Sequence, residues 1–371
     1  MHCALEGTVK KLLELWFKSS NHKYQFYMDS KIKHIDNLLL KIQYPSELPR
    51  TQRSIINYNL FKANECRNLI YYGLIYVLKD FMETSYYEHL INYILFIRIL
   101  TQDYVDNNDI IKSKLLINQF VKNFEKLYGS TNSSFNLHSH LHLPDQVAIY
   151  GPLNKISCFP FEGVFKICHN LFFGTVNIAE QIAANLKLIT LLNNTDIVNQ
   201  NLIQFMNDSN FQEINHSDVN KILFPKQISI NNLRDVERKL LNPLVTKDII
   251  ITGKRALINC KKFSTNTDNK NFKTQNFTIR YLNSTSYKYG ILRNFYNINN
   301  VIYALVQTFR KAQNFVSDQT IEEHLNKYFL ICHLSEEYEI IHYKNIDTKC
   351  VILKNQNEYF ISVCNLLNEH D

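Results

Sequence analysis

The chain has 371 residues, of which 45% are hydrophobic and 13% aromatic, so it can bury sizeable cores and is not a wholly disordered protein. It contains only 8 glycines and 7 prolines, which favours long helices over a turn-rich all-β protein. The net charge of +7 is compatible with DNA as a partner, but by itself it does not establish one.

The 8 cysteines form no C-x-x-C pair and follow no signal peptide, so we expect reduced thiols in an intracellular protein. The longest apolar run, from Leu90 to Leu100, is interrupted by Asn92 and Arg98. This run is too short to cross a bilayer and is typical of a buried helix, so we expect no membrane partner.

Apolar residues recur at helical spacing through most of the first 190 residues. Leu5, Leu12 and Trp16 share one face of a helix predicted over residues 4–18. Further helices are predicted near residues 32–42 and over about 62–82, 85–101 and 107–128, the last of which stops at Gly129. Another begins at about residue 135 and is broken at Pro144. Two more are predicted, one from near residue 161 and one over about 175–193.

After about residue 225 the pattern changes to short β-type runs separated by polar turns, which predicts a small β-barrel or sandwich. The runs cover residues 248–252, 255–260, 277–281, 288–292, 338–343, 349–353 and 358–363. A basic stretch lies among the first of them, and it could either contact phosphates or form a solvated face: Lys247, Lys254, Arg255, Lys261 and Lys262.

Two histidines four residues apart, His138 and His142, lie on one face of a helix, which is how helical metal sites present imidazoles. Glu162 follows 20 residues later in an apolar frame and is a candidate metal ligand. The pair alone is a weak motif, and a histidine pair without metal is the simpler interpretation of it. His140 points elsewhere by helical geometry.

Five ordered blocks within residues 1–162 resemble the catalytic domain of CACTA-type (En/Spm) transposases. The blocks begin at Met1, Arg53, Phe120, Asn136 and Gly151. They comprise Met1, His2, Cys3, Leu5, Gly7, Lys10, Leu12, Leu13 and Trp16; Arg53, Ser54, Lys62, Ala63, Glu65, Arg67 and Tyr72; Phe120, Leu127, Tyr128 and Gly129; Asn136, His138, His142 and Leu143; and Gly151, Pro152, Leu153, Ser157, Phe159, Phe161 and Glu162. The tail after residue 255 resembles that of the family less specifically.

The resemblance implies an RNase H-like fold in which three acids hold two Mg²⁺ or Mn²⁺ ions for phosphodiester attack. It implies that Glu162 is the third acid, and that His2, His138 and His142 contribute to a structural zinc site beside a helical insertion. The family's second acid would lie two residues before Met1, so two of the three acids are missing from this sequence. We therefore expect Glu162 to be vestigial, and Mg²⁺ or Mn²⁺ to bind only where a complete catalytic domain exists.

Other acids and thiols could in principle complete these sites. Glu6, Glu65 and Glu125 have no spacing that supports a metal pair, and Glu65 with Arg67 more simply forms a structural polar network. Cys3 could replace a zinc donor, but a small buried apolar residue is the simpler interpretation.

The fold class that follows is mainly α, of the α+β type: helices of an RNase H-like transposase domain followed by a small β-barrel-like domain. We expect a truncated RNase H-like and helical-insertion region over 1–195, a linker over 196–235 and a β-rich domain over 236–371. Because most of the central sheet would precede Met1, we expect residues 30–150 to pack well, and residues 1–20 and 160–190 to pack less well or to cover one another.

The expected function is that of a transposase-derived protein that does not catalyse strand transfer. Two alternatives stay open, a DNA-binding or protein-interaction module and a fragment of a longer active transposase. DNA is the expected partner, homo-oligomerisation is left open, and the expected location is the nucleus.

Overall fold

The computed structural model describes residues 3–48, 52–156, 168–194, 220–245, 247–259, 261–266 and 275–364. The chain divides into two compact units, a larger one of residues 1–156 with 220–369 and a smaller one of residues 157–219 with 370–371. The larger unit contains both helices and an antiparallel sheet, so the α+β class is as predicted. The three domains expected from the sequence, over 1–195, 196–235 and 236–371, stay a prediction.

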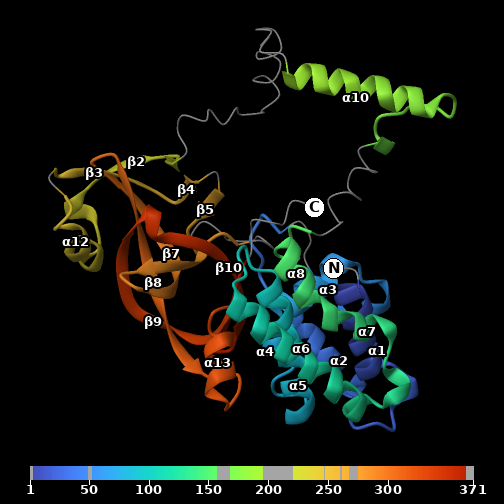
Figure 1. Ribbon diagram of the computed structural model, residues 1–371. Helices are drawn as coiled ribbons and strands as arrows, with labels where there is room; N and C mark the ends of the chain where they lie inside the picture. The colour runs from blue at the N-terminus through green and yellow to red at the C-terminus, as the bar shows by residue number, and fades with distance from the viewer. Residues whose placement is uncertain are drawn as a thin grey trace. The chain divides into compact units, whose positions relative to one another are not determined.

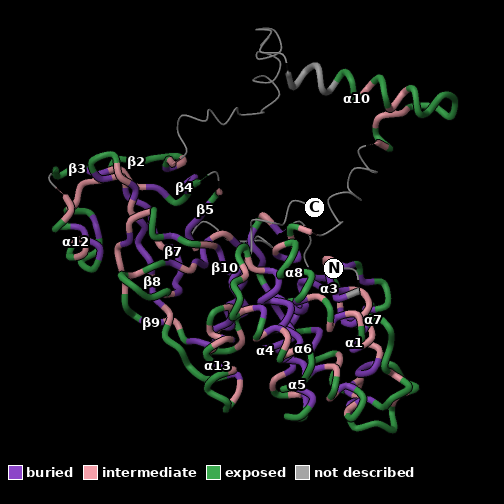
Figure 2. The backbone as a smooth tube through the Cα atoms, viewed as in Figure 1, coloured by how far each residue is buried: buried purple, intermediate pink, exposed green. Residues whose placement is uncertain are grey.

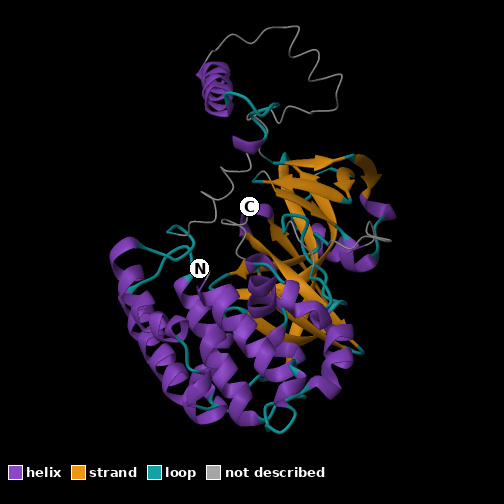
Figure 3. Ribbon diagram, turned by 90° about the vertical axis from the view of Figure 1, so that its right-hand side faces the viewer, coloured by secondary structure: helices purple, strands orange, loops and turns teal. Residues whose placement is uncertain are grey.

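Helices form the first part of the larger unit, where they gather into one cluster (Figures 1 and 3). A π-helical segment, Cys3–Val9, leads into the first of them. The helices are α1 (Lys10–Phe17), α2 (Ile32–Leu39), α3 (Ala63–Tyr72), α4 (Leu74–Val77), α5 (Thr84–Leu100), α6 (Asn107–Tyr128), α7 (Phe135–Ser139) and α8 (Leu143–Tyr150).

Helix α5 is the centre of the cluster, because nearly every residue from Tyr86 to Leu100 is buried (Figure 2). A helix that is apolar all round belongs inside a protein, as the sequence predicted for this run. Helix α6 begins where the Asp106 carboxylate accepts a 2.8 Å hydrogen bond from the Asp109 amide, and it ends at Gly129 with φ +87°.

Two expectations for the helices are wrong. The N-terminal segment is not poorly packed, since Leu5, Leu13 and Trp16 have no exposed surface. The single helix predicted over 62–82 is divided at Gly73, which separates α3 from α4. A Cβ at Gly73 would lie 2.7 Å from Leu39 Cδ2, so the missing side chain lets α2 approach closely.

Strands and two further short helices form the second part of the larger unit. All seven predicted runs overlap strands, whereas a long strand after residue 300 was not foreseen. The elements are β1 (Lys221–Leu223), β2 (Lys226–Ser229), α12 (Asp235–Leu241), β3 (Ile249–Gly253), β4 (Arg255–Ile258), β5 (Lys261–Ser264), β6 (Thr278–Asn283), β7 (Ser286–Ile298), β8 (Val301–Gln313), α13 (Gln319–Leu325), β9 (Phe329–His342), β10 (Ile346–Asn355) and β11 (Glu358–Val363).

Six of these strands close into a ring. The hydrogen-bonded order is β7-β6-β10-β11-β9-β8, and β8 pairs with β7 again, every pairing being antiparallel. Strands β3 and β2 continue the sheet outward from β7. Buried side chains such as Leu292, Phe295 and Val306 form its core. Closure leaves no unpaired edge within the six strands.

The turn between β7 and β8 explains why two long strands lie side by side. Asn299 and Asn300 form a two-residue connection with φ +51° and +63°, and Ile298 pairs with Val301 across it. Asparagine tolerates the left-handed region better than other non-glycine residues, and such turns match the twist of antiparallel strands.

Several contacts join the helices to the ring. Gln43 and Ile352 exchange backbone hydrogen bonds of 2.8 and 3.2 Å, which form a single antiparallel bridge. The Ser362 hydroxyl donates to the Tyr71 carbonyl oxygen at 2.7 Å. These contacts place the end of α2 beside β10, and they position the cavity described below.

The smaller unit contains helix α10 (Ile178–Asn194), at the position predicted for a helix over 175–193. Several apolar side chains on it are exposed, including Ile178, Leu186 and Leu188. The helix predicted from near residue 161 lies outside the described residues. Within the described part of the chain, no helix is both long enough and apolar enough to cross a membrane.

Candidate functional site

The structure brings His138 and His142 together as their spacing predicts. Helix α7 ends at Ser139, a 3₁₀ turn of His140–His142 follows, and the two imidazole rings of the pair lie 5.5 Å apart between centroids. Both side chains are exposed. Two imidazoles supply half of the donors that a tetrahedral zinc site needs.

The other expected metal ligands, His2 and Glu162, lie outside the described residues. Among the residues that are described, no three His, Cys, Asp or Glu side chains are grouped so that they could hold a metal ion. The zinc site of His2, His138 and His142 therefore stays a prediction, as does the role of Glu162.

His140, between the two, has no exposed surface. Its Nδ1 donates to the Asn136 carbonyl oxygen at 2.5 Å, and its Nε2 lies 3.4 Å from the Thr8 hydroxyl. The Tyr93 hydroxyl lies 3.1 Å from the same Nε2 but donates at 2.6 Å to the Ala4 carbonyl oxygen. Burial lowers the pKa of His140 to about 4, so a neutral imidazole ties the N-terminal segment to α5 and α7.

The alternative acids serve structural roles or face solvent. Glu65 is buried and accepts hydrogen bonds from the Arg53 guanidinium and, at 2.9 Å, from the Lys62 amide. It therefore caps the start of α3, which agrees with the structural network expected for it. Glu6 forms an ion pair with Lys10, and Glu125 is exposed on α6.

A cavity of about 680 Å³ opens beside the bridge between Gln43 and Ile352, and we call it the basic cavity. Its lining includes Lys41, Arg293 and Lys354, and none of the described residues that line it carries a carboxylate. None of the three cations forms an ion pair with a described residue. Three uncompensated cations around one cavity create a positive potential that attracts anions.

The Arg293 side chain is held in place. Its Nε and Nη2 donate to Gln307 Oε1 at 2.9 and 2.6 Å. Burial lowers the pKa of Arg293, and a second arginine nearby, Arg234, lowers it further. A half-buried guanidinium without a carboxylate is a costly arrangement that a bound anion would relieve.

Gln52 also lines the basic cavity, and its carboxamide is only partly hydrogen-bonded. Gln52 is buried, and its Nε2 donates to the Arg53 carbonyl oxygen at 3.3 Å. Its Oε1 has no hydrogen-bond partner among the described residues. A buried carbonyl of this kind favours a ligand that brings an N–H or O–H group.

Strands β1, β4 and β5 form a separate three-stranded sheet with one basic face. Lys221 and Lys262 both pair with Leu257, and Arg255 is two residues from Leu257, so the three cations lie on one face. The opposite face packs into the core of the ring through Ile222, Ala256, Ile258 and Phe263. We call the cationic side the basic face, and none of the three strands contains Asp or Glu.

A second cavity of about 620 Å³ lies near Arg98 and Tyr328, but its charges are mixed. Arg280 in its wall donates to Asp347 at 2.6 Å, and Asp103 and Glu323 also line it. It is therefore a weaker candidate for an anion than the basic cavity.

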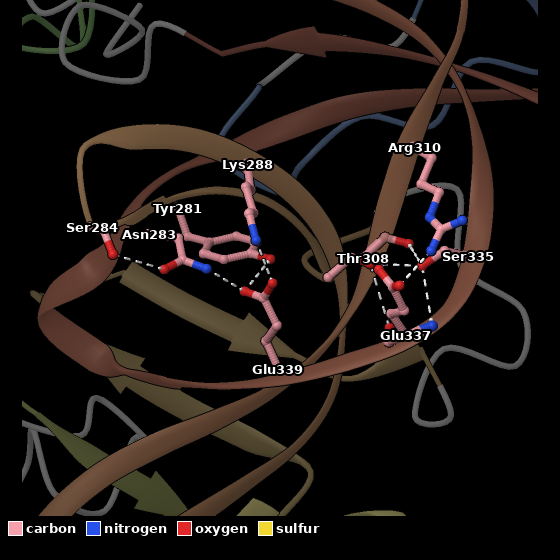
Figure 4. Close-up of polar contacts among 9 residues, drawn as sticks. All are labelled: Tyr281, Asn283, Ser284, Lys288, Thr308, Arg310, Ser335, Glu337 and Glu339. Atoms are coloured by element: carbon pink, nitrogen blue, oxygen red, sulfur yellow. Dashed lines mark hydrogen bonds and ion pairs between the residues drawn. The ribbon is translucent and has the colours of Figure 1, made fainter.

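Polar side chains of the ring bond to one another, some between strands that do not pair in the sheet (Figure 4). Glu339 accepts from the Tyr281 hydroxyl at 3.0 Å, from Asn283 Nδ2 at 2.9 Å and from Lys288 Nζ at 2.5 Å. Thr308 and Ser335 hydrogen-bond at 2.6 Å, where the pairing of β8 with β9 shifts register. These groups stabilise the long strands.

The sequence indicated part of the basic face but not the basic cavity. Lys254, Arg255, Lys261 and Lys262 are close in the chain, whereas Lys41, Arg293 and Lys354 come from segments that only folding brings together. Comparison of the chain with protein families, with curated proteins and with solved structures found no match.

Proposed function

We propose that this chain is a transposase-derived protein that binds DNA and does not itself cut or join it. The observation that carries the proposal is the basic face, where Lys221, Arg255 and Lys262 lie together on strands without a carboxylate. The five blocks within residues 1–162 support transposase ancestry, an RNase H-like origin of the helical part and a nuclear location.

A face of this kind recognises phosphates by charge and not by base sequence. Each lysine or arginine that neutralises a phosphate releases condensed counterions, so affinity falls as salt rises. Two such contacts, from Lys221 and Lys262, correspond to a slope of roughly −2 in a plot of log affinity against log salt concentration.

The test is the binding of a labelled blunt duplex to the full chain, measured by fluorescence anisotropy at several salt concentrations. We expect the double variant Lys221→Gln with Lys262→Gln to weaken binding at every salt concentration, and to reduce the slope by about two. Lys23→Gln with Lys122→Gln is the matched control, because both of those lysines are exposed and belong to other elements. Equal affinity of the two double variants, or no binding at low salt, would contradict the proposal.

The absence of catalysis is tested separately. The matching blocks supply one of the family's three acids, Glu162, so we expect no nicking or joining of DNA with Mg²⁺ or Mn²⁺. Activity of the purified chain that disappears in Glu162→Gln would instead indicate a working transposase or a fragment of one. DNA binding that fails while the fold is intact would favour a protein-interaction module, and sedimentation would show whether that module is a homo-oligomer.

A further inference from the structure

We propose that the basic cavity binds one unpaired nucleotide, either as a free nucleotide or as the last residue of a DNA strand. The strand version rests on the proposed DNA binding, whereas the free-nucleotide version does not.

Phosphate is the anion that suits the cations of the cavity. Lys41 and Lys354 are exposed, while the Arg293 guanidinium is hydrogen-bonded to Gln307. One fixed guanidinium and two flexible ammonium groups can surround the oxygens of a single phosphate. With no carboxylate in the described lining, a phosphate meets no repulsion there.

A base fits the remainder of the cavity. Apolar and aromatic side chains also line the cavity, including Phe277, Leu334 and the half-buried Tyr359, whose ring centroid lies 5.6 Å from Lys354 Nζ. Aromatic and apolar side chains bind the flat faces of bases. The Oε1 atom of Gln52 is buried without a hydrogen-bond partner among the described residues, and Gln52 lines the cavity. A rotation of this side chain would bring Oε1 to an N–H group of the ligand, which a base carries and a fatty-acid carboxylate lacks. This distinguishes a nucleotide from a lipid of similar size.

The basic face leads to this cavity. Lys254, which precedes Arg255 on the basic face, donates from its Nζ to the carbonyl oxygen of Arg293 at 3.4 Å. Asn266, just after β5, lines the cavity. A duplex held by the basic face would therefore bring its single-stranded end to the cavity without leaving the cationic surface.

The experiment uses the full chain and three probes: a blunt duplex, the same duplex with a single-stranded overhang, and free deoxyadenosine monophosphate. Anisotropy gives the affinity for the two duplexes, and calorimetry gives that for the nucleotide. We expect Lys354→Gln and Lys41→Gln each to lower the affinity for the overhang duplex or for the nucleotide about tenfold, because these lysines line the cavity. The blunt duplex should bind both variants as it binds the parent, and Lys122→Gln is the matched charge control.

Gln52→Leu separates the base from the phosphate. We expect it to weaken binding of deoxyadenosine monophosphate about tenfold while leaving weak binding of inorganic phosphate unchanged. The fluorescence of Trp16, buried in the helical cluster, reports whether each variant is folded.

The outcomes separate the two proposals. If the overhang adds nothing to the blunt duplex and the nucleotide does not bind, the cavity proposal is overturned while DNA binding stands. If the nucleotide binds but neither duplex does, the cavity proposal stands and DNA binding fails. If inorganic phosphate binds as tightly as the nucleotide, the base is not recognised and the proposal is overturned.

Discussion

The Nη2 atom of Arg98 donates a 2.8 Å hydrogen bond to the carbonyl oxygen of Val363. Arg98 lies in the last turn of the buried helix α5, and Val363 is the last residue of β11. The guanidinium carbon also lies 4.8 Å from the ring centroids of Tyr71 and of Tyr328. One buried cation therefore links the helical cluster to the strand ring.

Replacing Arg98 with methionine should destabilise the protein by about 2–4 kcal/mol, because a charged hydrogen bond and contacts with aromatic rings are lost. The measurement is urea unfolding followed by Trp16 fluorescence. Arg310→Met is the control, since Arg310 pairs with Glu337 on the surface and should contribute less than about 1 kcal/mol. Equal stability of the two variants would mean that Arg98 does not link the helical cluster to the strand ring.

Acid should destabilise the helical cluster through two buried histidines. Burial lowers the pKa of His89 and of His140 from 6.5 to about 4 in each case. Between these values the unfolded chain binds protons that the folded chain excludes, so stability is full above pH 6.5 and falls as the pH drops toward 4. Each histidine contributes up to about 3 kcal/mol to this loss.

The measurement for the histidines is the free energy of unfolding at pH 7 and at pH 4.5. His89→Phe should flatten the pH dependence, because phenylalanine can continue the stacking on Phe120, whose ring centroid lies 4.1 Å away. The control is His34→Ala, an exposed histidine outside the predicted zinc site, which should alter stability equally at the two pH values. A pH dependence that is the same in His89→Phe and in the parent would contradict the assignment.

The buried ion pair of Lys349 and Glu47 should respond asymmetrically to substitution. The Lys349 side chain is 0% exposed, burial lowers its pKa, and its other contacts are Asn276 at 3.1 Å and the Phe263 ring at 4.9 Å. Glu47→Gln should cost about 3–5 kcal/mol, because an ammonium group is left buried without its anion. The double variant Lys349→Met with Glu47→Leu should recover most of the loss. A double variant no more stable than Glu47→Gln would be inconsistent with this reasoning.

Gly290 permits the close pairing of β7 with β8. A Cβ there would lie 2.2 Å from Val306 Cγ1 and 2.7 Å from the Gln307 carbonyl oxygen. Gly290→Ala should therefore destabilise the chain by at least about 2 kcal/mol in thermal unfolding. Gly174→Ala, whose nearest neighbouring atom would be 3.6 Å away, should leave the melting temperature unchanged.

Zinc content tests the histidine pair. If His138 and His142 are donors with His2, elemental analysis of the full chain should give about one zinc per molecule. His138→Asn should lower this content, and a strong chelator should remove the metal. His34→Asn, on α2 and exposed, should have no effect. If the full chain binds no zinc, the predicted zinc site of His2, His138 and His142 is wrong.

Periodicity predicted most helices and strands, because burial of one face leaves a direct mark on the sequence. Helix α6 was foreseen at its observed limits, with Gly129 as its stop. Strand β8 was missed, although its hairpin turn, Asn299 and Asn300, is a recognisable signal between apolar runs.

The site was less accessible to sequence reasoning. The spacing of His138 and His142 predicted their proximity because one helical turn relates them. Lys41 and Lys354 share a cavity only because Gln43 pairs with Ile352, and nothing local to either lysine indicates that pairing. Long-range pairing of this kind has no periodic signature in a single sequence.

The same long-range pairing determines the order of events during synthesis. Gln43, Tyr71 and Arg98 bond to Ile352, Ser362 and Val363, respectively. The early helices therefore gain these contacts only after residues 352–363 have left the ribosome. Contacts so distant in sequence close slowly. Before β11 is synthesised, the surfaces of the helical cluster that β11 covers are exposed and can bind chaperones or other chains.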